Sequence, residues 1–169
     1  SQLTYPLALK CEGAAHKSEV GGVALNLCDL DAVFNAARAM PADSFLLEEM
    51  VDTAVAELLI GVIRDPAHGF VLTVGAGGIL TELAADTTSL LLPASPHDIE
   101  NALSNLRIAP LLRGYRGRPA AAIEAIVSSI IALGFFVERH RDSLDEVEIN
   151  PLICTPTNAV AADALIKIG

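Results

Sequence analysis

The stretch that decides how this chain folds is Tyr5–Leu27, YPLALKCEGAAHKSEVGGVALNL. An apolar run leads into Lys10, a polar loop holds His16 and Lys17, and Gly21-Gly22 opens a second apolar run. This pattern predicts a strand, a glycine-containing loop and a second strand. Lysine supplies positive charge and glycine leaves backbone N–H groups accessible, so the loop suits a polyphosphate.

The spacing of this loop excludes a P-loop. In that motif the lysine and serine follow glycines at fixed distances, so Lys17-Ser18 would require glycine at positions 11 and 16. The chain has Cys11 and His16 there. A phosphate bound at this loop therefore needs a different scaffold.

The composition describes a globular chain with an acidic surface. Its 169 residues are 52% hydrophobic, which is enough to bury a core. A formal charge of -10 argues against nucleic acid, because phosphate backbones require a basic face. The most membrane-like stretch, Ala125–Val137, is shorter than the roughly 20 apolar residues that span a bilayer. We expect neither nucleic acid nor a membrane as a partner.

Cysteine usage and the N-terminus bear on location. Cys11, Cys28 and Cys154 match neither a disulfide framework nor a zinc motif, which favours a reducing cytoplasm. No signal-peptide pattern is present. The chain begins at Ser1, without Met, and soon enters a buried-type strand, so we expect a fragment of a longer protein.

Strands and helices alternate irregularly along the rest of the chain, which predicts an α+β or mixed α/β fold. Asp29 or Asp31 caps a predicted helix, Ser95-Pro96 begins another, and Pro119 begins the longest. The predicted helices end at Ala39, about Leu106 and about Arg139, and the predicted strands are Ser44–Met50, the hairpin Ala54–Arg64 with Phe70–Val74, Glu146–Cys154 and Ala159–Ile166.

An acidic strand face near the C-terminus is a candidate metal site. Glu146, Glu148 and Asn150 alternate with apolar residues and share one face, and Asp163 falls where the return strand could place it beside Asn150. Carboxylate and amide oxygens are ligands that Mg²⁺ takes. Exposed glutamates on a strand are also common without any metal, and both interpretations stay open here.

Other features have ordinary structural interpretations. Lys10, His16 and Lys17 could be surface residues, and Gly75–Gly78 is more typical of a turn or bulge than of a phosphate cradle. The arginines of the loop Leu111–Arg118 are typical of a solvated connection. No Ser/His/Asp or Cys/His arrangement supports nucleophilic catalysis.

Six stretches in order resemble the ATP-grasp nucleotide-binding domain of NDP-forming acyl-CoA synthetases, relatives of the β subunit of succinyl-CoA synthetase. They are YPLALK, AHKSEVGGVALNL, LLEEMV, ELLIGVIRDPAHGFVLTVGAGGILTEL, PLLRGYRGRPA and EINPLICTPTNAVAADALI. The resemblance implies an α+β, ATP-grasp-like fold with mixed or antiparallel sheets and flanking helices, truncated at its N-terminus. Residues 1–169 would form one ATP-grasp domain with two lobes, approximately 1–50 and 51–169.

The resemblance also implies roles for individual residues. Those facing ATP would be Lys10 at the α-phosphate, His16, Lys17, Gly21 and Gly22 at the β- and γ-phosphates, Glu48, Glu49, Met50 and Val51 at adenine through their backbone, and Glu57 at the ribose. Glu148, Asn150 and Asp163 would hold Mg²⁺. In the ADP-forming acetyl-CoA synthetase branch, the resemblance makes His16 a phosphorylated relay.

The implied activity is that of an acid–thiol ligase. ATP, CoA and a carboxylic acid would give acyl-CoA, ADP and phosphate, with CoA-binding and ligase domains as partners and an oligomeric enzyme expected. Phosphoryl transfer needs positioning and charge neutralisation, which two lysines and Mg²⁺ supply. A non-catalytic nucleotide-binding module and another ATP-grasp ligase, such as a carboxylate–amine ligase, are the alternatives.

Overall fold

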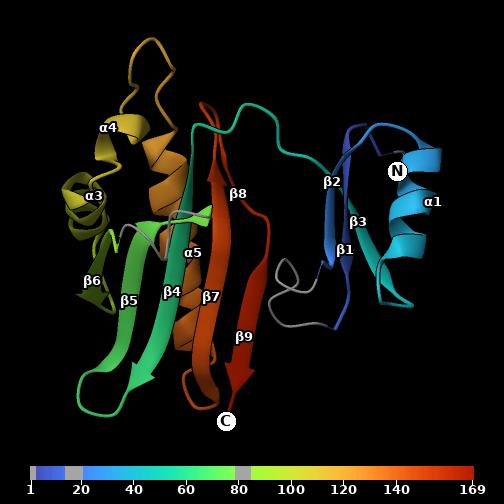
Figure 1. The fold of residues 1–169 in the computed structure, drawn as a ribbon. Coiled ribbons are helices and arrows are strands. Elements are labelled where there is room, and N and C mark those ends of the chain that lie inside the picture. The colour runs from blue at the N-terminus through green and yellow to red at the C-terminus, as the bar shows by residue number, and fades with distance from the viewer. Residues whose placement is uncertain (1–2, 14–20, 79–84) are drawn as a thin grey trace. The chain divides into compact units, whose positions relative to one another are not determined.

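The computed structural model describes residues 3–13, 21–78 and 85–169. The chain divides into two compact units, Ser1–Asp52 and Thr53–Gly169 (Figure 1). Each unit has its own sheet and its own apolar core.

The first unit is a three-stranded antiparallel sheet with one helix. The strands lie in the order β2 (Val23–Leu27), β1 (Leu7–Cys11), β3 (Phe45–Glu49). Helix α1 (Leu30–Ala39) begins at Asp29, whose carboxylate accepts a hydrogen bond from the N–H of Ala32 at 2.8 Å, as predicted for an N-cap. Alternate residues of β1 pack with α1 in a core that includes Leu7, Leu9, Leu27, Val33 and Leu47.

The second unit contains a six-stranded antiparallel sheet. Its order is β6-β5-β4-β7-β8, and β9 pairs with the first half of β7. The strands are β4 (Ala56–Asp65), β5 (Gly69–Ala76), β6 (Thr87–Leu91), β7 (Leu144–Cys154), β8 (Ala159–Ala161) and β9 (Ala164–Ile168). The predicted hairpin across the Asp65–Gly69 turn is confirmed by the pairing of β4 with β5.

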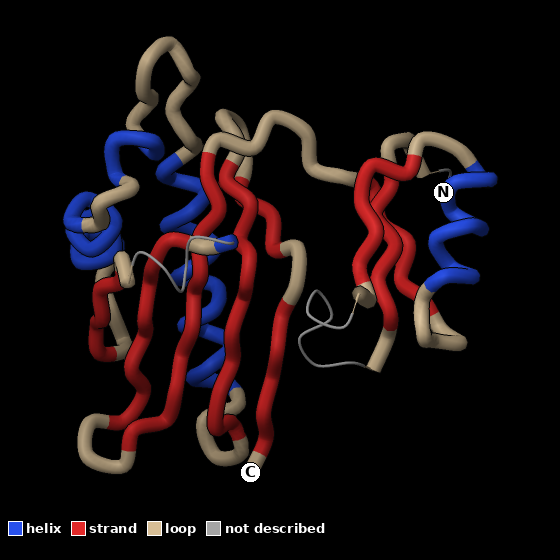
Figure 2. Tube along the Cα trace, in the orientation of Figure 1, coloured by secondary structure: helices blue, strands red, loops and turns tan. Residues whose placement is uncertain are grey.

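Three helices cover one face of this sheet. They are α3 (Pro96–Asn105), α4 (Ala109–Leu112) and α5 (Ile123–Arg139), and Figure 2 shows them behind the sheet and beside β6. The core between helices and sheet includes Ile99, Leu103, Ile126 and Ile130 against Leu58, Ile60, Val62, Leu72 and Val74. No helix within the described ranges is both long and apolar enough to cross a bilayer.

The opposite face of the sheet carries the alternate residues of its strands. Glu57 of β4 and Glu148 of β7 are each next to a residue whose side chain is buried under the helices. Their own side chains therefore point to the opposite face. No helix of the described part of this unit covers that face. The polar groups that the sequence singled out in the second unit therefore lie on its open side.

Local structure differs from the sequence prediction in three places. Helix α5 begins at Ile123 and not at Pro119, because Ala121 and Ala122 donate their N–H groups to Leu112 and Thr155 in an extended segment. Helix α4 was not predicted. The return strand is split into β8 and β9 around Ala162-Asp163.

The glycines of Gly75–Gly78 are explained by close packing. A Cβ on Gly75 would lie 2.7 Å from the Thr87 side chain, and one on Gly77 would lie 2.7 Å from the Leu58 carbonyl carbon. The N–H of Gly77 donates to the carbonyl of Glu57 at 2.8 Å. The prediction of a turn or bulge is wrong for Gly75 and Ala76, which continue β5 in regular pairing with β4. Glycine here permits close backbone approach.

Candidate functional site

The first unit positions Lys10 through an ion pair. Lys10 and Glu48 lie on neighbouring strands, on the sheet face opposite to α1, with Lys10 Nζ 2.6 Å from Glu48 Oε2. The Lys10 side chain is 11% exposed and that of Glu48 is 36% exposed. A charge-assisted contact of this length fixes the ammonium group in a restricted position.

Strand β3 is an edge strand, so the backbone N–H and C=O groups of its successive residues point alternately toward β1 and toward the free edge. The N–H of Met50 donates to the carbonyl of Pro6 at 3.1 Å, and Glu48 lies opposite Ala8, so both direct their backbone groups toward β1. The intervening Glu49 directs its N–H and C=O to the free edge. The resemblance implies adenine contacts through the backbone from Glu48 to Val51. Within this segment, the alternation turns the backbone groups of Glu48 and the N–H of Met50 toward β1, so Glu49 is the strand residue that faces the free edge.

The loop between β1 and β2 lies only partly within the described residues. His16 and Lys17 fall outside them. Gly21 has φ +69°, a conformation that glycine adopts without strain, and the carbonyl of Gly22 accepts a hydrogen bond from Cys11 N–H at 2.8 Å. Both glycines therefore close the end of the loop against β1.

Glu57 lies on the open face of the second unit, beside the glycine turn. A Cβ on Gly78 would collide with Glu57 Oε2, and Gly78 has φ +71°. The carboxylate is thus held next to a turn that only glycine fits.

The three predicted metal ligands lie on β7 and at the adjoining junction between β8 and β9. Asn150 Nδ2 donates to Glu148 Oε1 at 3.4 Å, and the backbone N–H of Asn150 donates to the carbonyl of Asp163 at 3.1 Å. The Asp163 carboxylate accepts from Ala164 N–H at 3.0 Å. The predicted proximity of Asp163 to Asn150 is confirmed.

Glu146, which shares the strand face of Glu148 and Asn150, pairs with Lys167. Lys167 Nζ lies 2.6 Å from Glu146 Oε2, and this hydrogen bond and charge raise the pKa of Lys167, with a further contribution from Glu148. Sequence analysis missed Lys167 because it ended the return strand at Ile166. The strand continues to Ile168, and its register with β7 places Lys167 opposite Glu146.

The donor set fits a hard divalent cation that is shared with phosphates. Mg²⁺ usually takes one or two protein carboxylates and completes its octahedron with phosphate oxygens and waters. Glu148, Asn150 and Asp163 offer two carboxylates and one amide. Across the three described ranges, no group of three or more His, Cys, Asp or Glu residues is arranged to hold a metal by itself.

The candidate residues are divided between the two units. Lys10 and the segment from Glu48 to Val51 belong to the first unit, whereas Glu57, Glu148, Asn150 and Asp163 belong to the second. The first unit carries the ion-paired ammonium group of Lys10 and the free edge of β3. The second carries its carboxylate and amide oxygens on the sheet face that its described helices leave uncovered.

Comparison with known proteins identifies the family. The family model for an ATP-grasp domain matches residues 1–168. An ADP-forming acetate–CoA ligase of Archaeoglobus fulgidus is 32% identical over 99% of this chain, and a trans-feruloyl-CoA synthase from an unknown prokaryotic organism is 32% identical over 97%. The chain spans a quarter of the length of each of these two relatives.

Solved structures agree with this relationship. The dinucleotide-forming acetyl-coenzyme A synthetase 1 of Ca. Korarchaeum cryptofilum, in complex with coenzyme A and Mg-AMPPCP, has a TM-score of 0.84 at 32% identity. That match covers 98% of this chain and 77% of the other. A complex of the same synthetase with coenzyme A and Ca-AMPCP gives a TM-score of 0.88 at 30% identity. The chain therefore belongs to the ATP-grasp family, and its relatives are ADP-forming CoA ligases.

Proposed function

We propose that this chain is the nucleotide- and Mg²⁺-binding part of an ADP-forming acyl-CoA synthetase. The observation that carries the proposal is the likeness, over 98% of this chain, to a synthetase structure that holds coenzyme A and Mg-AMPPCP. Within each unit, the residue types support it: Lys10 offers an ammonium group in the first unit, and Glu57, Glu148 and Asp163 offer carboxylates in the second. The complete enzyme would use CoA-binding and ligase domains as partners, as an oligomer, and the three free cysteines suit a reducing cytoplasm.

The first unit would bind the base and the α-phosphate. The ammonium group of Lys10, held by Glu48, would neutralise phosphate charge. The outward-facing backbone groups of Glu49, followed by Val51, would pair with the edge of adenine. Backbone groups recognise a base by hydrogen bonding without needing a particular side chain.

The second unit would bind the ribose and the cation. Glu57 would accept hydrogen bonds from the ribose hydroxyl groups, and Glu148, Asn150 and Asp163 would hold Mg²⁺ against the phosphates. The bound cation would supply charge neutralisation for phosphoryl transfer. His16, with Lys17 nearby in the sequence, would accept the γ-phosphoryl group and release it to the acylation site, so that ATP, CoA and acid yield acyl-CoA, ADP and phosphate.

Calorimetry on the complete protein tests the nucleotide site. We expect Mg²⁺ to strengthen ATP binding, and Asp163→Asn or Glu148→Gln to reduce that gain by about tenfold or more. Glu146→Gln is the matched control, because its carboxylate is on the same strand face but is paired with Lys167. ATP binding that ignores both Mg²⁺ and Asp163→Asn would instead favour the non-catalytic module.

Labelling tests the relay. The complete protein incubated with γ-labelled ATP and Mg²⁺ is expected to acquire acid-labile label, and His16→Ala should reduce it. Label that is unchanged in His16→Ala would exclude a relay at His16 while leaving the nucleotide site in place. Amide formation in place of a CoA thioester would assign the chain to another ATP-grasp ligase.

A further inference from the structure

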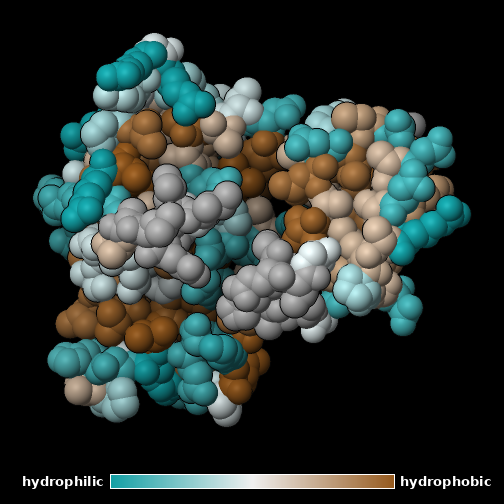
Figure 3. All heavy atoms as spheres, in the orientation of Figure 1, coloured by the Kyte–Doolittle hydropathy of each residue, from teal (hydrophilic) through white to brown (hydrophobic). Residues whose placement is uncertain are grey.

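The loop between α4 and α5 is the most basic part of this acidic chain. Arg113, Arg116 and Arg118 fall within six residues, and positions 108–123 contain no aspartate or glutamate. The chain as a whole carries a formal charge of -10. In Figures 1 and 3 this loop projects from the body of the second unit, beyond α4, with hydrophilic residues on its surface.

The loop has a defined conformation. The N–H of Ala121 donates to Leu112 at 2.9 Å across its base, and the N–H of Arg118 donates to Tyr115 at 3.0 Å near its tip. Arg116 has φ +49°, which is uncommon outside glycine, and its guanidinium lies over the ring of Tyr115 at 5.3 Å. These contacts give the loop a defined shape that presents its arginines.

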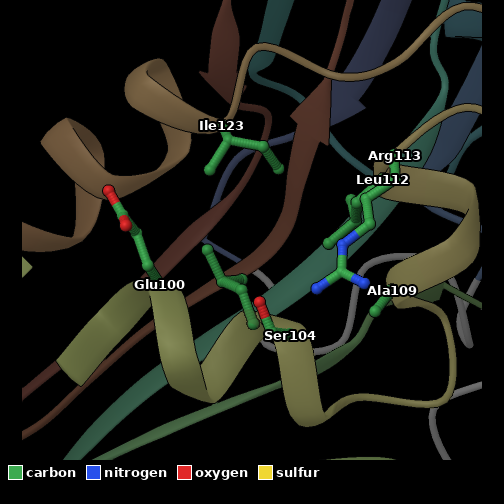
Figure 4. Close-up of a pocket in the computed structure, with 7 residues that line it drawn as sticks. Glu100, Ser104, Ala109, Leu112, Arg113 and Ile123 are labelled. Atoms are coloured by element: carbon green, nitrogen blue, oxygen red, sulfur yellow. The ribbon is translucent and has the colours of Figure 1, made fainter. Parts of the chain in front are cut away.

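A cavity of about 150 Å³ opens beside the base of the loop. Its floor includes Leu103, Leu112 and Ile123, from three different helical segments. Ser104 and Arg113 lie at its rim, with the Arg113 guanidinium beside Ser104 (Figure 4). An open cavity of this volume with an apolar floor has room for one aliphatic or aromatic side chain.

The two features together define one ligand chemistry. An apolar group would fill the cavity while a carboxylate beside it meets Arg113, which lines the cavity. Further carboxylates along the same segment would meet Arg116 on the projecting loop, since opposite charges meet across specific interfaces. Glu100 is on the side of the mouth away from the Arg113 guanidinium (Figure 4), so it leaves the basic side intact.

The place of the cavity in the fold favours a protein segment over a small acid. Helices α3 and α4 cover the sheet face opposite to the one that carries Glu57 and Glu148. A carboxylic acid substrate bound at the helices would be separated from the proposed phosphate site by the sheet. In two relatives that are four times the length of this chain, further segments accompany the matching part.

We propose that the cavity and the arginine loop form a docking surface for an acidic segment of a companion domain of the same ligase. The segment would insert one aliphatic or aromatic side chain between Leu103, Leu112 and Ile123. Its neighbouring aspartates or glutamates would pair with Arg113 and Arg116. This inference rests on the proposed function in one respect only, namely that the chain works as part of a larger enzyme.

Site-specific crosslinking tests the docking surface in the complete enzyme. With p-benzoylphenylalanine incorporated at Ser104, irradiation should join the cavity to a peptide from outside residues 1–169 in which an apolar residue adjoins Asp or Glu. Arg116→Glu should reduce the crosslink yield by about fivefold or more, because it places like charges together. Arg139→Glu is the matched control, since Arg139 is exposed at the far end of α5. Thermal melting should show that both variants remain folded.

Three results would overturn the proposal. The first is a crosslink that is absent or that joins only a second copy of residues 1–169. The second is a crosslink yield that Arg116→Glu leaves unchanged. The third is loss of the crosslink in millimolar benzoate, which would assign the cavity to a small carboxylic acid. The same preparations are assayed for Mg²⁺-dependent ATP binding. Loss of docking with intact nucleotide binding rejects only this inference, whereas docking without nucleotide binding rejects only the proposed function.

Discussion

The ion pair between Lys10 and Glu48 makes a quantitative prediction. Hydrogen bonds to charged groups contribute about 1.5–3 kcal/mol. Because the Glu48 side chain is 36% exposed while that of Lys10 is 11% exposed, we expect a value near the lower half of this range, about 2 kcal/mol. Glu48→Gln removes the charge and keeps the shape, so it should destabilise the β1–β3 pairing by about this amount.

Native-state hydrogen exchange of the β1 amides measures this effect locally. A loss of about 2 kcal/mol corresponds to exchange that is about 30-fold faster. Lys10→Met should have a similar effect, and the double variant should be less destabilised than the sum by about 1–2 kcal/mol. Additive single effects, within about 0.3 kcal/mol, would refute the pairing as a stabilising contact.

ATP affinity distinguishes the role of Lys10 from that of Glu48. Lys10→Met and the double variant should both bind ATP more weakly, because both lack the ammonium group. Glu48→Gln keeps that group and should retain most of the affinity. Equal losses in both single variants would indicate that Glu48 itself contacts the nucleotide.

Three further predictions concern the second unit. Arg64→Ala should lower the free energy of unfolding, measured by urea titration, by about 2–3 kcal/mol. Arg64 donates hydrogen bonds to the carbonyls of Leu144, at 2.9 Å, and Arg141, and its guanidinium lies over the ring of Phe70. The control Arg141→Ala removes only an exposed ion pair and should change the free energy of unfolding by under about 0.5 kcal/mol. Gly77→Ala should cost about 1–3 kcal/mol in thermal melting, since its Cβ would meet the β4 backbone; an unchanged melting temperature would contradict that approach. Burial raises the pKa of Cys154 to about 12, so iodoacetamide should label exposed Cys28 in the native protein and Cys154 only after unfolding.

The sequence predicted elements well wherever local signals agreed. The Asp29 cap, the Ser95-Pro96 helix start and the turn at Asp65–Gly69 all have the structure that their residue types favour. The capping box at Ser95 and Asp98 shows how short-range chemistry alone can set a helix boundary.

The prediction failed where long-range contacts decide. Pro119 is a good first residue for a helix, but Ala121 and Ala122 bond to distant carbonyls and keep the chain extended to Ile123. Helix α4 follows a turn whose N–H groups, from Arg107 and Ile108, donate to the buried carboxylate of Asp86. No local pattern reveals a partner about 20 residues earlier in the chain.

The candidate site was predictable in part for the same reason. The alternation of Glu148 and Asn150 is a local property, so their shared face could be inferred from sequence. The pairing of Lys10 with Glu48 depends on β3 returning beside β1, and that of Lys167 with Glu146 depends on the register of β9. Register across a sheet is set by the assembled fold.

The shared edge of β7 has a consequence for how this domain tolerates changes in length. β8 and β9 both pair with β7, and only Ala162-Asp163 separates them. One extra residue at that junction would turn every β9 side chain to the other side of the sheet, taking Lys167 away from Glu146. An insertion in the exposed turn at Thr157-Asn158 leaves that alternation alone, so natural indels should accumulate in the turn and be absent from the junction.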